Sequence, residues 1–182
     1  MSFNDLTAEL GTTRTNIHYH FGLKSHLAEE VLDEQVNFVL STYRSWWLNG
    51  ELSLKQKLLE SSEFNEQRYK IHNPNDEGRI WSLITRFRFD EDVITPKMKA
   101  KLAEFSLGVE SAVKVGVNHA VESEELCATA PVDEIVCLIA DVIHCSSLIS
   151  HAPYGIGHLI LSYKALSDLI FRAYGKRDVK QI

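Results

Sequence analysis

The chain is poor in cysteine and has no long apolar run. Its cysteines are Cys127, Cys137 and Cys145, an odd number that does not make a disulfide framework and favours a reducing cytoplasm. The most apolar window, 135–143, is short and contains Asp141, which excludes a membrane-spanning segment there. Because the N-terminus is polar, we also expect no signal peptide. These features predict a cytoplasmic protein with no membrane partner.

Positive charge is also scarce. The chain has 19 Lys and Arg residues against 25 Asp and Glu, a net charge of −6, which argues against a surface broadly coated for nucleic acid. Segment 1–27 is itself neutral, because Arg14 and Lys24 balance Asp5 and Glu9. The overall charge is therefore compatible with a local reader of nucleic acid in this segment.

Patterns of catalytic and metal-binding residues are missing too. His144, His151 and His158 are spaced by seven, but the Pro and Gly residues of 151–157 interrupt the helix on which they would share a zinc site. Cys145 and His144 are adjacent, so on a helix they point about 100° apart and form no nucleophilic pair. The sequence contains no acid–base pair or phosphate-binding loop. We therefore expect no enzyme, no metal site and no cofactor.

What the sequence does have is helical periodicity, which predicts an all-α fold. Ser53 and Gln56 form a capping-box pattern, and Thr95–Pro96 places a cap before a proline at the first helical position. The predicted helices cover about 24–48, 53–71, 79–89, 131–150 and 156–174, and a further helix begins at 95. The expected buried stripes are Leu27, Val31, Phe38, Thr42 and Trp46 in the first helix, and Met98, Leu102, Phe105, Val109, Ala112, Val113 and Ala120 in the helix from 95.

The first 32 residues have a pattern typical of short helices joined by a tight turn at Gly11-Thr12-Thr13. Gly11 can adopt the left-handed angles that end a helix, and Thr12 or Thr13 can cap the next one. Buried stripes are expected at Phe3, Leu6 and Leu10 before the turn and at Ile17 and Phe21 after it. The outer face is left with groups that suit base edges and phosphates in a major groove: Arg14, Thr15, Asn16, His18 and Tyr19. An ordinary helical hairpin with a polar face would have the same spacing.

The string from Leu6 to Leu27 resembles the DNA-binding signature of the TetR family of regulators, I-A-x-x-A-G-V-S-x-G-T-L-Y-x-H-F followed by a linker lysine and leucine. Leu6-Thr7 stands at I-A, Leu10-Gly11-Thr12-Thr13 at A-G-V-S, Thr15-Asn16-Ile17-His18 at G-T-L-Y, His20-Phe21 at H-F, and Lys24 and Leu27 at the linker positions. The sequence departs from the signature at Thr15, where the family has glycine, and at His18, where it has tyrosine.

The resemblance implies a helix-turn-helix DNA-binding domain followed by a helical ligand-binding and dimerisation domain. By position it implies DNA contacts from Thr13, Arg14, Thr15, Asn16, His18, Tyr19, His20 and Lys24. Among these, Arg14, Asn16, His18 and Tyr19 would read bases, and His20 and Lys24 would contact phosphate. The family has a further helix before this motif, so we expect a late start, a trimmed chain or a real loss of that helix.

The last two predicted helices are apolar on more than one face, so each needs two packing partners. One partner is the body of the same chain. The other is a second copy, giving a four-helix bundle across a two-fold axis; the alternative is that one chain covers both faces. The residues concerned are Ile135, Val136, Leu138, Ile139, Val142 and Ile143, and then Ile156, Leu159, Ile160, Leu161, Tyr163, Leu166, Leu169, Ile170 and Phe171.

The middle helices are rich in large aromatic residues, which makes a cavity for a largely apolar ligand plausible. Arg79 and Arg86 would share a helix face and could anchor a carboxylate, although such arginines more often pair with acids on neighbouring helices. The predicted ligand-binding residues are Trp46, Arg79, Trp81, Arg86, Phe105 and His144, of which the aromatic ones could equally be ordinary core.

These patterns divide the chain into a partial helix-turn-helix domain, 1–30, and a helical ligand-binding and dimerisation domain, 31–182. The expected function is a ligand-responsive repressor that acts as a homodimer on a palindromic operator. Its expected partners are double-stranded DNA and an unidentified small molecule. The alternative is a helical dimer that binds a small molecule or protein and no longer binds DNA.

Overall fold

The computed structural model describes residues 11–13, 15–16, 19, 23–90 and 94–176. These residues are mostly helical and include no strand; one isolated bridge pairs Leu126 with Gly175. The main helices are α3 (Lys24–Trp47), α4 (Leu54–His72), α5 (Leu83–Phe89), α6 (Pro96–Glu122), α7 (Val132–Ile149) and α8 (Gly155–Tyr174). The predicted all-α fold is confirmed. The predicted domain boundary at residue 30 falls inside α3, which continues through it without a break.

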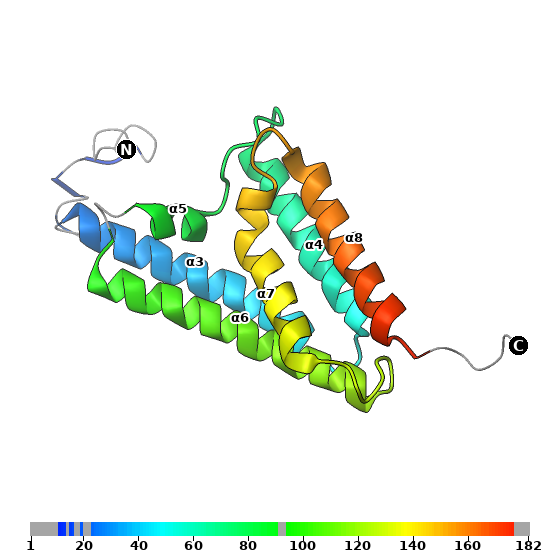
Figure 1. The fold of residues 1–182 in the computed structure, drawn as a ribbon. Coiled ribbons are helices and arrows are strands. Elements are labelled where there is room, and N and C mark those ends of the chain that lie inside the picture. Colours follow the sequence, from blue (N-terminus) through cyan, green and yellow to red (C-terminus); the bar gives the residue numbers. More distant parts are fainter. Residues whose placement is uncertain (1–10, 14, 17–18, 20–22, 91–93, 177–182) are drawn as a thin grey trace, which may run out of the picture.

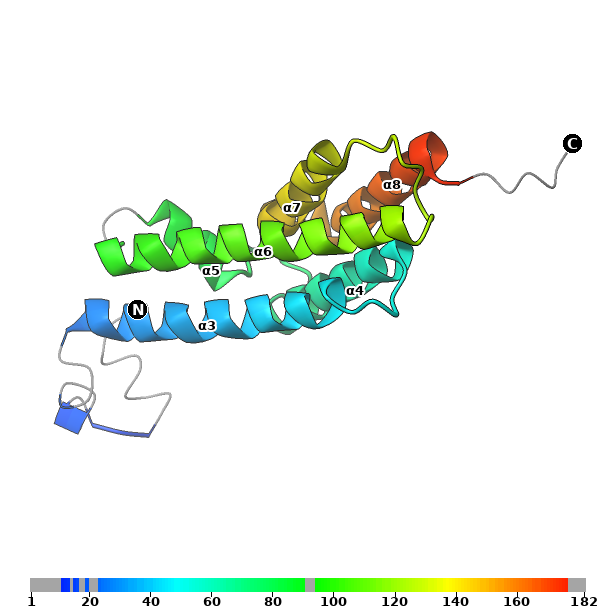
Figure 2. The ribbon, with the colours of Figure 1, turned by 90° about the horizontal axis from the view of Figure 1, so that it is seen from below.

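The helices form two packed pairs with α7 between them. α3 and α6 run side by side in the same direction along one edge of the molecule (Figures 1 and 2). α4 and α8 lie antiparallel to each other, and α7 packs against both α6 and α8 (Figure 1). The short helix α5 packs against α3 and α7. The N-terminal ends of α3 and α6 therefore project away from α4 and α8 (Figure 2).

Helix starts follow the capping signals in the sequence. The Ser53 hydroxyl accepts a hydrogen bond from the backbone N–H of Gln56, whose side chain accepts one from the backbone N–H of Ser53, so the predicted capping box is confirmed. Thr95 accepts from the backbone N–H of Met98, and Pro96 occupies the first turn of α6. In both places a side chain satisfies an N–H that the helix itself leaves without a partner.

The predicted buried face of α3 is wrong. Phe38 is 54% exposed, and Leu27, Val31, Thr42 and Trp46 are only partly buried. The residues that α3 buries are Leu32, Val36, Val39, Leu40, Tyr43 and Trp47. The helix carries two apolar stripes one residue apart, and packing on α6 selected the stripe that periodicity alone could not distinguish. By contrast, the predicted stripe of α6 is buried throughout, as expected.

The predicted helix over 79–89 begins later, at Leu83. Ser82 ends the preceding segment as the N-cap, accepting a hydrogen bond from the backbone N–H of Thr85. Before it, the Asn73 side chain accepts a hydrogen bond from the backbone N–H of Arg79 at 2.7 Å. This contact holds Arg79 outside the helix. The expectation that Arg79 and Arg86 share one helix face is therefore wrong.

Close packing of α3 on α6 depends on two glycines of α6. A Cβ at Gly108 would lie 2.7 Å from a Leu40 methyl, and a Cβ at Gly116 would lie 2.6 Å from the Trp47 ring. Both positions are buried. At the N-terminal end the same pair is joined by charge, since Lys101 lies 2.8 Å from Asp33 and Lys97 lies 3.5 Å from Glu29. None of the described helices is long and apolar enough to cross a membrane.

Candidate functional site

A small closed cavity lies where α3, α4, α6, α7 and the segment leading into α5 meet. Its volume is about 20 Å³, which is room for about one water molecule. The lining residues are Val39, Tyr43, Asn65, Arg68, Trp81, Ser82, Ile84, Thr85, Phe105, Ile143, His144, Ser146 and Ser147. The lining is more polar than the sequence led us to expect, and it contains no Asp or Glu.

Asn65 organises the polar side of this cavity. Its side-chain nitrogen lies within donating distance of the hydroxyls of Tyr43 at 2.9 Å, Tyr163 at 3.0 Å and Ser146 at 3.1 Å, three acceptors for two N–H groups. The Tyr43 hydroxyl is also within 3.2 Å of the Asn65 carbonyl oxygen, to which it can donate. Burial raises the pKa of Tyr43 to about 12 and also raises that of Tyr163, so both hydroxyls stay neutral. The network joins α3, α4, α7 and α8.

Arg68 brings a positive charge to the cavity without an acidic partner among the described residues. Its guanidinium carbon lies 4.8 Å from the centre of the Trp81 ring and 5.4 Å from that of Phe64. Trp81 is held in place because its backbone N–H donates to Ser147 and its indole N–H donates to Ser150. Burial lowers the pKa of Arg68, yet a guanidinium remains charged in any protein environment.

His144 stands on the α7 side of the cavity against Phe105, with the ring centres 5.7 Å apart. Its Nε2 is buried and has no hydrogen-bond partner. Burial, followed by the positive charge of Arg88, lowers the pKa of His144 to about 4, while Asp141 acts in the opposite direction. The imidazole is therefore neutral near pH 7, and this lining residue of the cavity has a buried Nε2 with unused hydrogen-bonding capacity.

The structure brings three of the six predicted ligand-binding residues together at this cavity: Trp81, Phe105 and His144. Trp46 instead packs against Tyr43 and Phe64, outside the lining. Arg79 and Arg86 are exposed; Arg79 lies 3.9 Å from Glu77, and Arg86 donates to the backbone carbonyl of Ile80. The prediction that these two arginines anchor a ligand is not supported by their positions.

Sequence reasoning missed the residues that contribute most of the polarity, Asn65 and Arg68. Leu54 and Leu58 are followed at the same helical spacing by Ser61, Asn65 and Arg68. The sequence therefore placed these polar residues on the same helix face as two apolar ones. Polar residues on the inward face of a helix must meet partners or a ligand inside the protein. Nothing in the sequence alone showed that this face turned inward.

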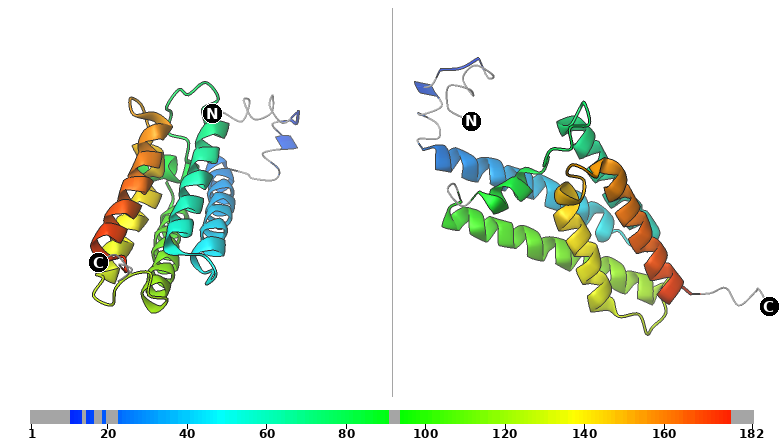
Figure 3. Two further views of the ribbon diagram at one scale, coloured as in Figure 1. Left: turned by 90° about the vertical axis from the view of Figure 1, so that its right-hand side faces the viewer. Right: turned by 45° about the horizontal axis from the view of Figure 1, so that its top comes forward.

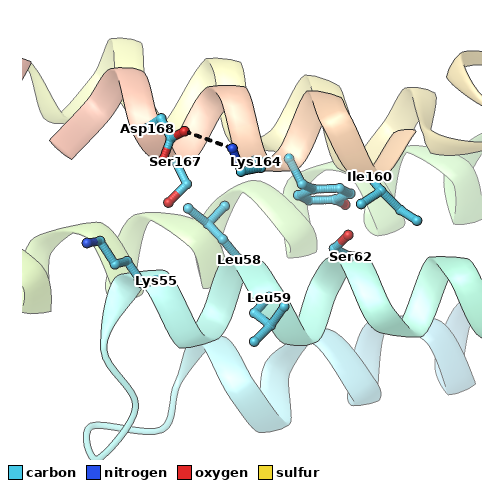
Figure 4. A pocket seen from close by; sticks show the side chains of 9 residues that line it. Lys55, Leu58, Leu59, Ser62, Ile160, Lys164, Ser167 and Asp168 are labelled. Atoms are coloured by element: carbon cyan, nitrogen blue, oxygen red, sulfur yellow. Dashed lines mark ion pairs between the residues drawn. The ribbon is translucent and has the colours of Figure 1, made fainter. Parts of the chain in front are cut away.

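A larger, open groove lies between α4 and α8, with a volume of about 350 Å³ (Figure 4). Leu58, Leu59 and Ile160 form its apolar surface. Lys164 lies 3.5 Å from Asp168, and Lys55 lies over the Phe171 ring. Lys55 is exposed and keeps its hydration, whereas Arg68 in the closed cavity is half-buried.

The turn predicted to join the two short N-terminal helices is partly described. Gly11 has the left-handed φ of 60°, and the backbone N–H of Asn16 donates to the Thr13 hydroxyl at 3.2 Å, so Thr13 acts as the predicted cap. Thr13, Thr15 and Asn16 are exposed, and Tyr19 is 84% exposed. These side chains line one shallow surface hollow. Lys24 is exposed at the start of α3, whereas Arg14, His18 and His20 lie outside the described residues.

The outer face of α7 and α8 has exposed apolar side chains. The two helices lie together on one side of the molecule (Figure 3). Leu138 is 54% exposed, Leu161 58% and Leu169 65%. Other predicted apolar positions, including Leu166 and Ile170, are buried within the protomer. The inner face of these two helices is therefore buried within the protomer, and their outer face has no partner in the described part of the chain.

The three histidines considered for zinc do not share a helix. His144 lies in α7, His151 lies in the turn after it, and His158 lies in α8. Within the described residues no group of three or more His, Cys, Asp and Glu side chains could hold a metal ion. The three cysteines are all free.

The fold is similar to those of solved bacterial proteins. The reduced form of Escherichia coli NemR superposes with a TM-score of 0.70 at 10% identity, covering 92% of this chain and 85% of NemR. A TetR transcriptional regulator from Legionella pneumophila superposes with a TM-score of 0.62 at 16% identity, covering 93% of this chain and 86% of that protein. No protein-family model matches the chain, and no curated protein matches its sequence. The chain therefore has the fold of TetR-type regulators, which confirms the expected architecture.

Proposed function

We propose that this chain is a DNA-binding transcriptional regulator that responds to a small molecule. The observation that carries the proposal is a continuous connection along α3. The exposed groups of the N-terminal turn precede its first residue, Lys24, and two of its later residues, Val39 and Tyr43, line the closed cavity. A regulator needs such a link between the site that reads DNA and the site that binds a ligand. The three free cysteines fit our proposal that it acts in the cytoplasm.

A second copy of the chain completes the proposed regulator. Leu138, Leu161 and Leu169 give α7 and α8 an apolar outer face on which an identical face can pack about a two-fold axis. Such a dimer presents two reading elements to two half-sites of a palindromic operator, spaced by about one helical turn of DNA, roughly 34 Å, or a multiple of it.

Ligand binding would act by shifting populations of this dimer. A ligand that fits one arrangement of α3 better than another changes the spacing or tilt of the reading elements. A coupling free energy of about 1–3 kcal/mol is enough to change DNA affinity by roughly 5- to 150-fold. We propose repression as the outcome, with the ligand releasing the protein from its operator.

Replacement of Arg14 and Lys24 tests DNA binding. A preferred duplex is first selected from a random pool with the full chain, and its affinity is measured by fluorescence anisotropy at several salt concentrations. We expect Arg14→Ala to cost about 1–3 kcal/mol on the preferred duplex and to relax the preference at one base pair of each half-site. Lys24→Ala should weaken binding to all duplexes alike and lower the salt slope by about one.

The matched comparison is between the preferred duplex and random DNA for each variant. Unchanged affinities of Arg14→Ala for both would contradict the assigned reading face. Failure to select any duplex would favour the alternative function, a helical dimer that binds a small molecule or protein without DNA, which the net charge of −6 also favours.

A further inference from the structure

The closed cavity contains positive charge and no negative charge to balance it. Arg68 is its charged lining residue, and no Asp or Glu lines it. This is unusual in a chain whose net charge is −6. Arg68 is half-buried, and a charge that loses part of its hydration in a protein is normally paired in compensation. We propose that the ligand of this cavity is a small organic carboxylate that binds the guanidinium of Arg68. The biological role of this ligand rests on the proposed ligand response, whereas its binding to Arg68 does not.

The guanidinium of Arg68 has its hydrogen-bonding capacity free. In the described part of the chain it lies over the rings of Phe64 and Trp81 and interacts electrostatically with Tyr43 and His72, and none of these contacts is a hydrogen bond. A guanidinium carries five N–H donors in a planar fork that fits a carboxylate with two parallel hydrogen bonds. The aromatic contacts stabilise the cation but accept none of these N–H groups in the plane of the fork. A carboxylate would supply the missing acceptors.

Groups around Arg68 add to the positive field. Arg88 lies over the Phe105 ring and donates to the Ser106 hydroxyl, again without a carboxylate partner in the described part of the chain. Outside the cavity, burial and then the positive charges of Arg68 and Arg86 lower the pKa of His72. The buried Nε2 of His144 has no partner either and is available to the ligand. An anion would relieve this repulsion and satisfy buried polar atoms at the same time.

The rest of the lining favours a carboxylate that carries an apolar group. Val39, Ile84, Phe105 and Ile143 form the hydrophobic part of the wall. Because the cavity is only about 20 Å³, an organic ligand must displace part of that wall. Ile84 and Thr85 belong to the shortest element of the wall, because α5 has seven residues and the other wall helices have 18 or more. α5 contacts α3, so a displacement of α5 acts on the helix that directly follows the reading turn.

Isothermal calorimetry on the full chain, with benzoate as the probe and benzamide as its neutral counterpart, tests the inference. We expect benzoate to bind one site per chain and benzamide to bind at least about 10-fold more weakly, because a charged hydrogen-bonded pair contributes about 1.5–3 kcal/mol. Arg68→Met should weaken benzoate by about 10- to 100-fold without changing benzamide. Arg68→Lys should lose less, because it keeps the charge but not the planar fork. Arg86→Met, at an exposed arginine of the neighbouring helix, is the matched control and should bind like the unmodified protein.

Three results would overturn the inference: equal affinity for benzoate and benzamide, undiminished benzoate binding by Arg68→Met, or no benzoate binding by the unmodified chain. The first and third need no variant, so they decide the question even if Arg68→Met does not fold. Benzoate binding that depends on Arg68 but leaves DNA affinity unchanged would support the carboxylate site and contradict the ligand response. DNA binding without any benzoate binding would contradict the carboxylate site alone.

Discussion

The side-chain amide of Asn65 links α4 to α3, α7 and α8 through Tyr43, Ser146 and Tyr163. These groups are buried, so each hydrogen bond replaces one that water made in the unfolded chain. A network of this kind contributes little net stability but makes any other arrangement of the four helices costly, since it would leave buried polar groups unpaired. At the residue scale, the cavity is defined by such polar contacts rather than by its aromatic residues.

The unfolding free energy should fall as the pH is lowered from about 6.5 to 4, and His144 should be one cause. The pKa of His144 is about 4 in the folded protein and near 6.5 in the unfolded chain, so within this window only the unfolded state takes up the proton. Proton uptake by the unfolded state favours unfolding, and the full shift corresponds to at most about 3 kcal/mol. Urea unfolding at a series of pH values measures the slope of the unfolding free energy against pH. This slope should be smaller in His144→Gln than in the unmodified chain.

The lowered pKa of His72 adds to the same slope, so part of it should remain in His144→Gln. The matched control is His72→Gln, which should keep the part due to His144. An identical slope in His144→Gln and the unmodified chain would show that His144 is accessible to protons in the folded protein.

At the scale of elements, the contact between α3 and α6 is the one on which the body depends most. Small residues at Gly108 and Gly116 let the two helices approach closely, and Trp47 and Leu40 fill the space. The ion pairs of Lys97 and Lys101 lie at the exposed N-terminal end of the same contact. Exposed ion pairs contribute at most about 1 kcal/mol, so burial and close packing dominate this contact.

Gly116→Ala should lower the free energy of unfolding by about 1–3 kcal/mol. The added methyl would lie 2.6 Å from the Trp47 ring and 3.2 Å from its backbone oxygen, and neither can move without displacing α3. The gain of about 1 kcal/mol in helix propensity is too small to offset this. Denaturant unfolding followed by circular dichroism measures the difference.

Gly108→Ala is the matched variant, because its methyl meets only side-chain atoms of Leu40 and Arg44, which can rotate away. It should therefore lose less stability than Gly116→Ala. A Gly116→Ala protein at least as stable as the unmodified chain would mean that α3 and α6 are not packed as closely as described.

At the scale of the whole molecule, the open question is what covers α7 and α8. Leu166 and Ile170 belong to the apolar set from which the sequence predicts a dimer, but both are buried within the protomer, so a charge there would disrupt folding. Leu138, Leu161 and Leu169 are more than half exposed on the same two helices. They are the positions at which a dimer can be tested separately from folding.

Leu161→Glu should convert the proposed dimer into monomers with little change in helical content. In a dimer the two carboxylates would be buried without partners, which should raise the dissociation constant by at least about 100-fold, or roughly 3 kcal/mol. Leu107→Glu, on an equally exposed leucine of α6, is the control and should leave the dimer intact. Sedimentation velocity at micromolar concentration distinguishes the two. A monomeric unmodified protein would contradict the proposed dimer.

The sequence by itself determined the elements that local chemistry controls. The capping box at Ser53, the Thr95–Pro96 start of α6 and the glycine turn at Gly11 were predicted, because each depends on residues only a few positions apart. The stripe of α6 was predicted because it is the single regular stripe of that helix. Trp81, Phe105 and His144 were predicted to lie near one cavity and all three line it, whereas their binding of a ligand stays a prediction.

Only the tertiary structure decided which of its two possible faces α3 buries. α3 carries two apolar stripes, and contact with α6 chose the one containing Trp47 rather than Phe38. The contact with Asn73 holds Arg79 outside α5, so this helix begins later than predicted. Packing against other helices turns Asn65 and Arg68 toward the cavity. A polar residue looks the same in sequence whether it faces water or a cavity, because its environment is created by segments far away in the chain. That is why the charge at the centre of the proposed carboxylate site could be recognised only after the helices were packed.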